Sequence, residues 1–325
     1  PDPSAVSVRR RQMSGFTLTA MTNGDGEQHD QIDRQVLVTL AHGYVQLLAD
    51  EYGVDILHLK GRAVDERLWQ RSASGEPGPR HSLDVDVLVR PAHVDRFVAA
   101  LLAHDWHKVT GFVEGSAFAH AMNLRHRYLG NVDLHRWWPG FGLSAQEAFD
   151  RLWDEHLATR EIANVRCTVP DLAMQRLVLL LHAGRTGGVA HADYDACWRT
   201  ASVEERAEVR ALAEQFDAQI AFAAAIGELE EHRGKPEYLL WRHFSRGSQN
   251  RWDEWAGRWR AARGLRGKAR VVRGFVSINA DLMRERIGHE PTTRDYVAEY
   301  GLRVRSAAVD VARSVRRRRP TGGGR

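Results

Sequence analysis

The spacing of apolar residues changes at Val169-Pro170, and this change limits the folds that the chain can adopt. Before it, strand-length segments that are apolar or alternating are interspersed with helical segments. The predicted strands are 55–59, 83–89, 107–113, 123–129 and 132–137, and the predicted helices are 35–52, 61–69 and a segment that starts at Pro91. After it, helical spacing recurs in 172–182, 203–216, 221–231, 251–263, 269–284 and 292–315. We therefore predict an α/β (α+β) fold, a small mixed β-sheet flanked by helices and followed by an all-helical C-terminal domain.

Length and composition are those of an ordinary globular protein. At roughly 150 residues per domain, 325 residues suggest about two domains. We predict a flexible leader (1–28), a sheet-containing domain (29–169), a helical domain (170–315) and a basic flexible tail (316–325). The two cysteines, Cys167 and Cys197, are too few for a disulfide framework or a four-cysteine zinc site, which favours a cytoplasmic protein. No apolar run approaches the roughly 18 residues of a membrane span, so we expect no membrane partner.

Charge is unevenly distributed along the chain, whose net charge is +4. Residues 251–325 contain 19 Lys and Arg against 8 Asp and Glu and carry +11, so residues 1–250 carry −7. A basic region attracts polyanions, and nucleic acid is therefore retained as a partner of the C-terminal region. The alternative is a solubilising tail, which is the preferred interpretation for 316–319. Trp252, Trp255 and Trp259 recur at helical spacing among these arginines, and we interpret them as a packing stripe rather than a base-stacking surface.

Two aspartates share one face of the predicted strand 83–89. Side chains alternate between the faces of a strand, so Asp84 and Asp86 lie on the same side. Neighbouring carboxylates are costly to ionise together unless a cation compensates, and Mg²⁺ prefers carboxylate oxygens. An isolated Asp-x-Asp is more simply a solvated edge strand, so the motif needs support from elsewhere in the sequence.

A second acidic strand supplies that support. Asp133 lies in Val132-Asp133-Leu134-His135, directly after the turn signal Gly130-Asn131. If this strand is beside the first, three carboxylates share one face and can hold two divalent ions about 3.5–4 Å apart. His135 faces the same side and is interpreted either as a group that orients or deprotonates an acceptor, or as a buried, hydrogen-bonded histidine.

A third segment, His58-Leu59-Lys60-Gly61-Arg62, lies where a predicted strand turns into a helix. Glycine lets the backbone approach a phosphate, the following helix offers free N–H groups, and Lys60 or Arg62 supplies positive charge. Lys-Gly alone is common at such junctions. Its position one strand before the paired aspartates favours a triphosphate cradle.

The joint pattern resembles the uncharacterised nucleotidyltransferase family of the DNA polymerase β-like superfamily. It consists of Leu-Lys-Gly at 59–61, Arg-x-Ser-x-Asp-x-Asp-x-Leu-Val at 80–89, and Val-Asp-Leu-His at 132–135, and the resemblance covers roughly residues 35–200. The resemblance implies that Asp84 and Asp86 bind metal and that Asp133 is the third catalytic carboxylate. It also implies that Lys60, Gly61, Arg80 and Ser82 face the nucleotide phosphates. The usual Gly-Gly or Gly-Ser of the superfamily is Gly61-Arg62 here. His182 and Asp193 match the helical segment that follows the catalytic domain in this family and are carried over as site-lining residues, with packing as the alternative.

The sequence therefore predicts an enzyme that binds a nucleoside triphosphate with Mg²⁺ or Mn²⁺ and transfers its α-phosphate to an acceptor hydroxyl, releasing pyrophosphate. A small molecule, a protein side chain and an RNA end are all open as acceptors. One alternative is a non-catalytic nucleic-acid-binding or antitoxin-like module. Another is an enzyme of the same fold that modifies tRNA ends as a toxin.

Overall fold

The computed structural model describes residues 8–13, 16–21, 32–69, 78, 81–112, 118–248, 251–262, 264–276, 278 and 280–318. The chain divides into two compact units, Pro1–Asp33 and Arg34–Arg325. In the first unit, β1 (Val8–Met13) pairs antiparallel with β2 (Phe16–Met21). The sequence pattern does not predict this hairpin, which falls in the segment expected to be a leader.

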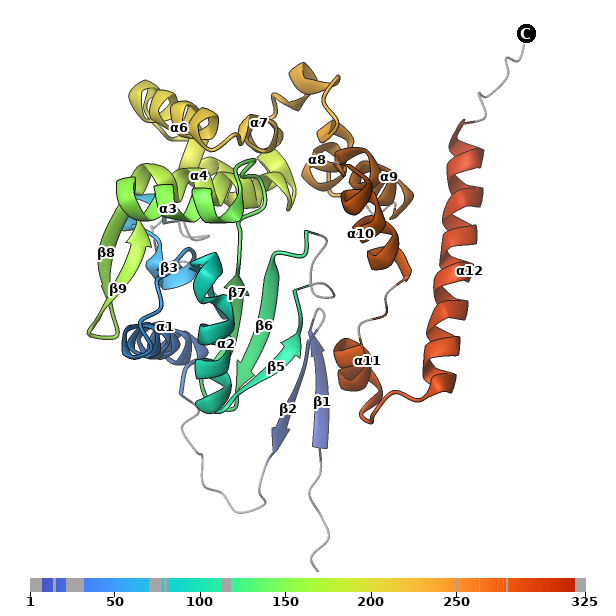
Figure 1. Cartoon of the computed structure of the whole chain (residues 1–325), viewed down its shortest axis with the longest axis horizontal. Coiled ribbons are helices and arrows are strands. Elements are labelled where there is room, and N and C mark those ends of the chain that lie inside the picture. Colours follow the sequence, from blue (N-terminus) through green and yellow to red (C-terminus); the bar gives the residue numbers. More distant parts are fainter. Residues whose placement is uncertain are drawn as a thin grey trace, which may run out of the picture. The chain divides into compact units, whose positions relative to one another are not determined.

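The second unit contains a five-stranded sheet with the strand order β3-β4-β7-β6-β5 (Figure 1). Its strands are β3 (Ile56–His58), β4 (Asp84–Val89), β5 (Trp106–Thr110), β6 (Ala121–His126) and β7 (Gly130–His135). β4 and β7 run parallel, and the other neighbouring pairs are antiparallel. The predicted fold class, a mixed sheet accompanied by helices, is confirmed.

The two faces of this sheet differ because side chains alternate along each strand. On one face, buried strand residues pack with α1 (Arg34–Glu51) and α2 (Val94–Ala103), which lie beside the sheet in Figure 1. From β4 these are Val85, Val87 and Val89. On the other face, Leu88 belongs to a separate hydrophobic cluster that includes residues of α4 (Leu172–Gly184). The carboxylates of β4 share this second face with Leu88.

A second hairpin connects the sheet to the helices. After α3 (Ala145–Glu155), β8 (Leu157–Ile162) pairs antiparallel with β9 (Val165–Pro170). Asp171 then begins α4, because its side chain accepts a hydrogen bond from the Met174 N–H. The helices that follow are α5 (Ala192–Tyr194), α6 (Val203–Gln215), α7 (Gln219–Ile226) and α8 (Tyr238–Ser245), with a π-helical turn at Asp195–Arg199.

The last helices of the chain are α9 (Arg251–Ala261), α10 (Gly264–Val276), α11 (Ala280–Ile287) and α12 (Thr293–Arg318). The single helix predicted over 269–284 is therefore two helices. Trp259 is 45% exposed, and the Lys268 ammonium lies 5.2 Å from the centre of its ring, so a packing role is the wrong prediction for this residue. Across the part of the chain that the structure describes, no helix combines the length and the apolar character needed to cross a membrane.

Several predicted boundaries differ from the observed ones. β5 and β6 begin one and two residues earlier than predicted, and Gly130-Asn131 belongs to β7 while the turn is formed by 127–129. The predicted helix 61–69 is two short 3-10 turns, Gly61–Ala63 and Glu66–Leu68. The second begins at Asp65, whose side chain accepts from the Arg67 N–H and starts a new turn instead of a continuous helix.

Candidate active site

β4 and β7 bring the predicted carboxylates onto one face of the sheet. Asp86 is the register partner of Asp133 in the parallel β4–β7 pair. Paired residues of neighbouring strands point to the same face, and Asp84, two residues before Asp86, shares that face. The two acidic strands, β4 and β7, are therefore neighbours in the sheet.

The Asp86 carboxylate is 2% exposed and holds two partners. Its Oδ2 lies 2.9 Å from Lys60 Nζ, and its Oδ1 lies 2.8 Å from His135 Nε2. Burial alone would raise the pKa of Asp86, but the Lys60 ammonium and the His135 ring hold it below its ordinary value. His135 is itself buried, and burial lowers its pKa despite the hydrogen bond with Asp86. It therefore matches the buried, hydrogen-bonded interpretation of this histidine.

Asp133 lies in a different electrostatic environment from Asp86. Burial and then the charges of Asp86 and Asp84 raise the pKa of Asp133 to about 7. Asn123 of β6, the register partner of Asp133, donates its side-chain N–H to Asp133 Oδ1. Asn123 is not among the predicted site residues, because its contact with Asp133 depends on the β6–β7 register.

Asp84 lies at the start of β4 and is oriented by Ser82. The Ser82 hydroxyl lies 2.6 Å from the Asp84 carbonyl oxygen and 3.3 Å from its carboxylate Oδ1. Burial and the charge of Asp86 raise the pKa of Asp84. Ser82 is held in turn by α1, since the Gln35 side chain donates to its carbonyl oxygen at 2.9 Å.

Gly61 is packed tightly against the Ser82 and His42 side chains. Its φ of +62° is in the left-handed region, and a Cβ at this position would lie 2.9 Å from the Ser82 Cβ. Glycine is therefore needed for packing whether or not a phosphate binds here. Arg62 is half-buried, and its Nε makes no hydrogen bond with any residue that the structure describes. Arg80, the remaining predicted phosphate ligand, lies outside the described residues.

His182 and Asp193 lie together, with His191 as an additional neighbour. His182 Nδ1 is 3.6 Å from Asp193 Oδ2, and His191 Nδ1 is 3.4 Å from the same oxygen. Burial and then the charge of Lys60 lower the pKa of His182 to about 3. The structure thus brings His182 and Asp193 together and adds His191 to them.

Sequence reasoning missed a second cation beside the carboxylates. Arg185 Nη1 lies 2.5 Å from His120 Nε2, and its guanidinium lies 5.2 Å from the centre of the Trp138 ring. Burial lowers the pKa of Arg185 and the charges of Asp86 and Asp133 partly offset this effect, so that its pKa is about 10. His120 and Arg185 are 65 residues apart, so no local motif could have linked them to each other or to the aspartates.

The donor set suits a hard divalent cation. One ligand atom each from Asp86, Asp133 and His135 lies within 4.8 Å of the others, and Asp84 shares the same face. Burial and then the neighbouring carboxylates raise the pKa of Asp133, and converging carboxylates require either a proton or a cation between them. The three aspartates therefore fit a Mg²⁺ or Mn²⁺ site, with His135 orienting Asp86.

A known protein family matches a large part of this chain. Residues 28–232, more than half of the chain, match the family described as uncharacterised nucleotidyltransferase. The chain belongs to that family. Among solved structures, this family member is similar to the antibiotic-resistance factor ANT(2'')-Ia, with 14% identity, a TM-score of 0.40, and coverage of 62% of this chain and 99% of that chain. It is also similar to an antigenic nucleotidyltransferase-like protein from Paracoccidioides brasiliensis, with 16% identity, a TM-score of 0.32, and coverage of 58% and 93%. Comparison with curated proteins gives no match.

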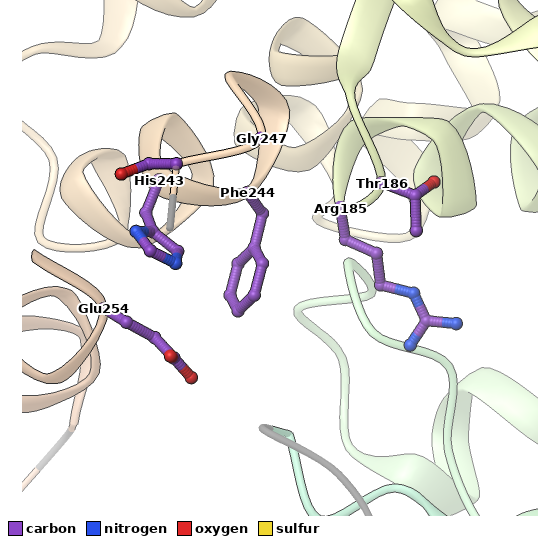
Figure 2. Close-up of a pocket in the computed structure, with 7 residues that line it drawn as sticks. Arg185, Thr186, His243, Phe244, Gly247 and Glu254 are labelled. Carbon is purple, nitrogen blue, oxygen red and sulfur yellow. The ribbon is translucent and has the colours of Figure 1, made fainter. Parts of the chain in front are cut away.

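A pocket in this nucleotidyltransferase family member has Arg185 in its wall (Figure 2). Its volume is about 390 Å³, and Thr186, His243, Phe244, Gly247, Ser248 and Glu254 complete the lining. Arg185 comes from the C-terminal end of α4, and the Phe244 ring lies between His243 and Arg185 in Figure 2. The arginine that contacts His120 thus also lines the pocket.

Proposed function

We propose that the protein transfers a nucleoside monophosphate from a nucleoside triphosphate to an acceptor hydroxyl and releases pyrophosphate. The observation that carries this proposal is the register pair of Asp86 and Asp133, with Lys60 bound to Asp86. Converging carboxylates beside an ammonium form the charge arrangement that phosphoryl transfer requires. Membership of the nucleotidyltransferase family supports the same general chemistry.

The three aspartates have separate tasks in this proposal. Asp84, Asp86 and Asp133 would hold Mg²⁺ or Mn²⁺, which when bound neutralises phosphate oxygens and makes a hydroxyl more acidic. Lys60 would exchange its contact with Asp86 for a phosphate oxygen of the nucleotide. His135 keeps the Asp86 carboxylate oriented through the 2.8 Å hydrogen bond.

Asp133 is the candidate acceptor of the proton. Its carboxylate would lie beside the acceptor hydroxyl, and Asn123 orients Asp133 through Oδ1. As the acceptor oxygen bonds to the α-phosphorus, the bond from that phosphorus to the bridging oxygen breaks. Its electron pair leaves with pyrophosphate, and the hydroxyl proton moves to Asp133.

The acceptor is a small molecule, a protein side chain or an RNA end. A second pocket of about 480 Å³ is the surface that favours RNA, because cationic side chains predominate in its lining. These are Arg233, Lys235, Arg242, Arg246 and Arg260. Glu230, which also lines this pocket, is already paired with Arg233 and Arg246.

Incubation with each α-labelled nucleoside triphosphate, Mg²⁺ and fractionated acceptors tests the proposal. The wild-type chain should transfer label, and Asp133→Asn should reduce the rate by about 100-fold or more because the proton acceptor is lost. Asp95→Asn is the matched control, since Asp95 is an exposed residue of α2. Label transfer at the wild-type rate by Asp133→Asn, with an unchanged Tm, would contradict the proposal.

A further inference from the structure

Arg185 has no carboxylate partner within ion-pair distance among the residues that the structure describes. Its polar contact is with the His120 imidazole, and its flat face lies over Trp138. Burial lowers the pKa of His120 well below its ordinary value, so this ring is neutral and its Nε2 accepts from Arg185. The guanidinium is therefore fixed in position while most of its N–H donors and its full charge are available.

A half-buried, unpaired guanidinium is costly unless an anion binds it. The charges of Asp86 and Asp133 reach Arg185, but the ion pair of Asp86 is with Lys60 and not with Arg185. Arginine presents several donors in one plane, which suits the oxygens of a phosphate group. The arrangement at Arg185 thus resembles a binding site for an anionic ligand more than a structural ion pair.

The strand order places Lys60 and His120, the polar partner of Arg185, at different strands, while both cations lie over the Trp138 ring, Lys60 Nζ at 5.9 Å and the Arg185 guanidinium at 5.2 Å from its centre. Lys60 follows β3 and His120 directly precedes β6, and β4 and β7 lie between these two strands in the sheet. In an in-line displacement, the attacking and leaving oxygens are on opposite sides of the phosphorus. If the triphosphate lies beside Lys60, as the proposed function requires, the acceptor approaches from the side of His120 and Arg185.

The pocket in Figure 2 is on that side and suits a small anion-bearing molecule. A volume of about 390 Å³ is at the lower end of the range for small-molecule sites. Glu254, its acidic residue, is already paired with Arg258, so Arg185 is the dominant charge available to a ligand. His243 also lines this wall, and its buried Nδ1 makes no hydrogen bond with any described residue.

We propose that this pocket binds a small hydroxyl acceptor carrying a phosphate group, and that Arg185 binds this phosphate. The inference rests on the proposed function for the direction of approach, but the phosphate contact itself can be tested without catalysis. The phosphate that Arg185 binds could also belong to the nucleoside triphosphate. The first experiment distinguishes the phosphate of the acceptor from that of the nucleotide.

Calorimetric titration of inorganic phosphate into the full chain, saturated with Mg²⁺ and a non-hydrolysable nucleoside triphosphate, measures the contact directly. Phosphate should still bind, and Arg185→Gln should weaken it about 10-fold or more, as expected for loss of a charge-assisted hydrogen bond. The phosphate affinity of Arg185→Lys should lie between those of the wild type and Arg185→Gln. Arg210→Gln, which removes an arginine of α6 that is paired with Glu228, should bind phosphate like the wild type.

Two results of this titration would overturn the inference. In the first, bound nucleotide abolishes phosphate binding and Arg185→Gln weakens nucleotide binding instead, which would assign Arg185 to the triphosphate. In the second, wild type and Arg185→Gln bind phosphate equally. The Tm of each variant is measured alongside, and Arg185→Lys keeps the test valid if Arg185→Gln fails to fold.

The transfer experiment offers sugars with and without a phosphate as acceptors for α-labelled nucleotide. Wild type should label the phosphorylated member of each pair preferentially, and Arg185→Gln should lose that preference. Label found only in RNA, and reduced by Arg242→Gln but not by Arg185→Gln, would overturn the inference. Arg185-dependent phosphate binding without any transfer would support the phosphate contact and contradict the proposed function instead.

Discussion

At the scale of single residues, the two neighbouring carboxylates of the proposed site, Asp86 and Asp133, have different partners. Asp86 has both a cation and an imidazole as partners, whereas Asp133 has an amide, and the pKa values of these two carboxylates move in opposite directions. Environments that separate the pKa values of neighbouring carboxylates are typical of sites where one binds and the other exchanges a proton.

Gly61→Ala tests the packing at the phosphate side of the site. The new Cβ would meet Ser82 at 2.9 Å, and φ of +62° costs about 1–2 kcal/mol for an L-residue. We expect a lower free energy of unfolding by chemical denaturation, together with weaker nucleotide binding as Ser82 and Asp84 move.

Gly130→Ala is the control for this change. Gly130 also has a left-handed φ, +89°, but a Cβ there would have nothing within 4 Å. Gly130→Ala should lower the free energy of unfolding through the strained backbone conformation, but it should leave nucleotide binding unchanged. Equal effects of the two substitutions on nucleotide binding would contradict a specific role for the Gly61–Ser82 contact.

The aspartates could be predicted from the sequence because each lies in a local strand pattern. Arg185 and His120 could not, since they are 65 residues apart in the chain. Asn123 could not either, because its contact with Asp133, ten residues later, depends on the exact register of the β6–β7 hairpin. The apolar pattern also put β6 two residues too late, and this displacement hid the pairing of Asn123 with Asp133.

At the scale of elements, two buried histidines join α1 to β3. His42 Nδ1 of α1 lies 3.0 Å from His58 Nδ1 of β3, and both side chains are fully buried. Burial lowers the pKa of both rings, that of His42 to about 4. The α1–β3 contact thus depends on both imidazoles staying neutral.

Acidification should weaken the fold through this pair. In the unfolded chain a histidine binds a proton near pH 6.5, whereas folded His42 does so only near 4, so stability is retained above about pH 6.5 and lost toward pH 4. The free energy of unfolding changes by about 1.4 kcal/mol per pH unit for each imidazole that binds a proton in the unfolded chain but not in the folded chain. His42→Asn should reduce the slope measured by urea unfolding between pH 4 and 7.

The exposed His81 provides the comparison for this measurement. His81→Asn should leave the pH slope of the free energy of unfolding as in the wild type. An unchanged slope in His42→Asn would show that the buried pair does not carry the acid sensitivity.

Elements with strong periodicity could be predicted, and elements fixed by tertiary contacts could not. β4 and α4 have clear apolar patterns, and their observed bounds are close to the predicted ones. β8 has mostly exposed or half-exposed side chains, so its sequence carries little apolar signal. It forms a strand because β9 pairs with it along its whole length.

At the scale of the whole second unit, one hydrophobic cluster crosses the predicted domain boundary at residue 170. Leu57 and Leu88 of the sheet belong to the same cluster as Leu177 and Leu180 of α4. The boundary remains a prediction, but this shared core couples the carboxylate site to the helix that carries Arg185. A position in α4 should therefore affect the stability of both parts.

Leu180→Ala tests this coupling, because Leu180 is fully buried in the shared cluster. The cavity should lower the free energy of unfolding by about 2–5 kcal/mol. Far-UV circular dichroism and tryptophan fluorescence should still report one coincident transition, since sheet and α4 share this core. Leu83→Ala, at a residue that is 58% exposed, should change stability by no more than about 0.5 kcal/mol. Two separated transitions in Leu180→Ala would instead indicate that sheet and helices unfold independently, as the predicted boundary at residue 170 implies.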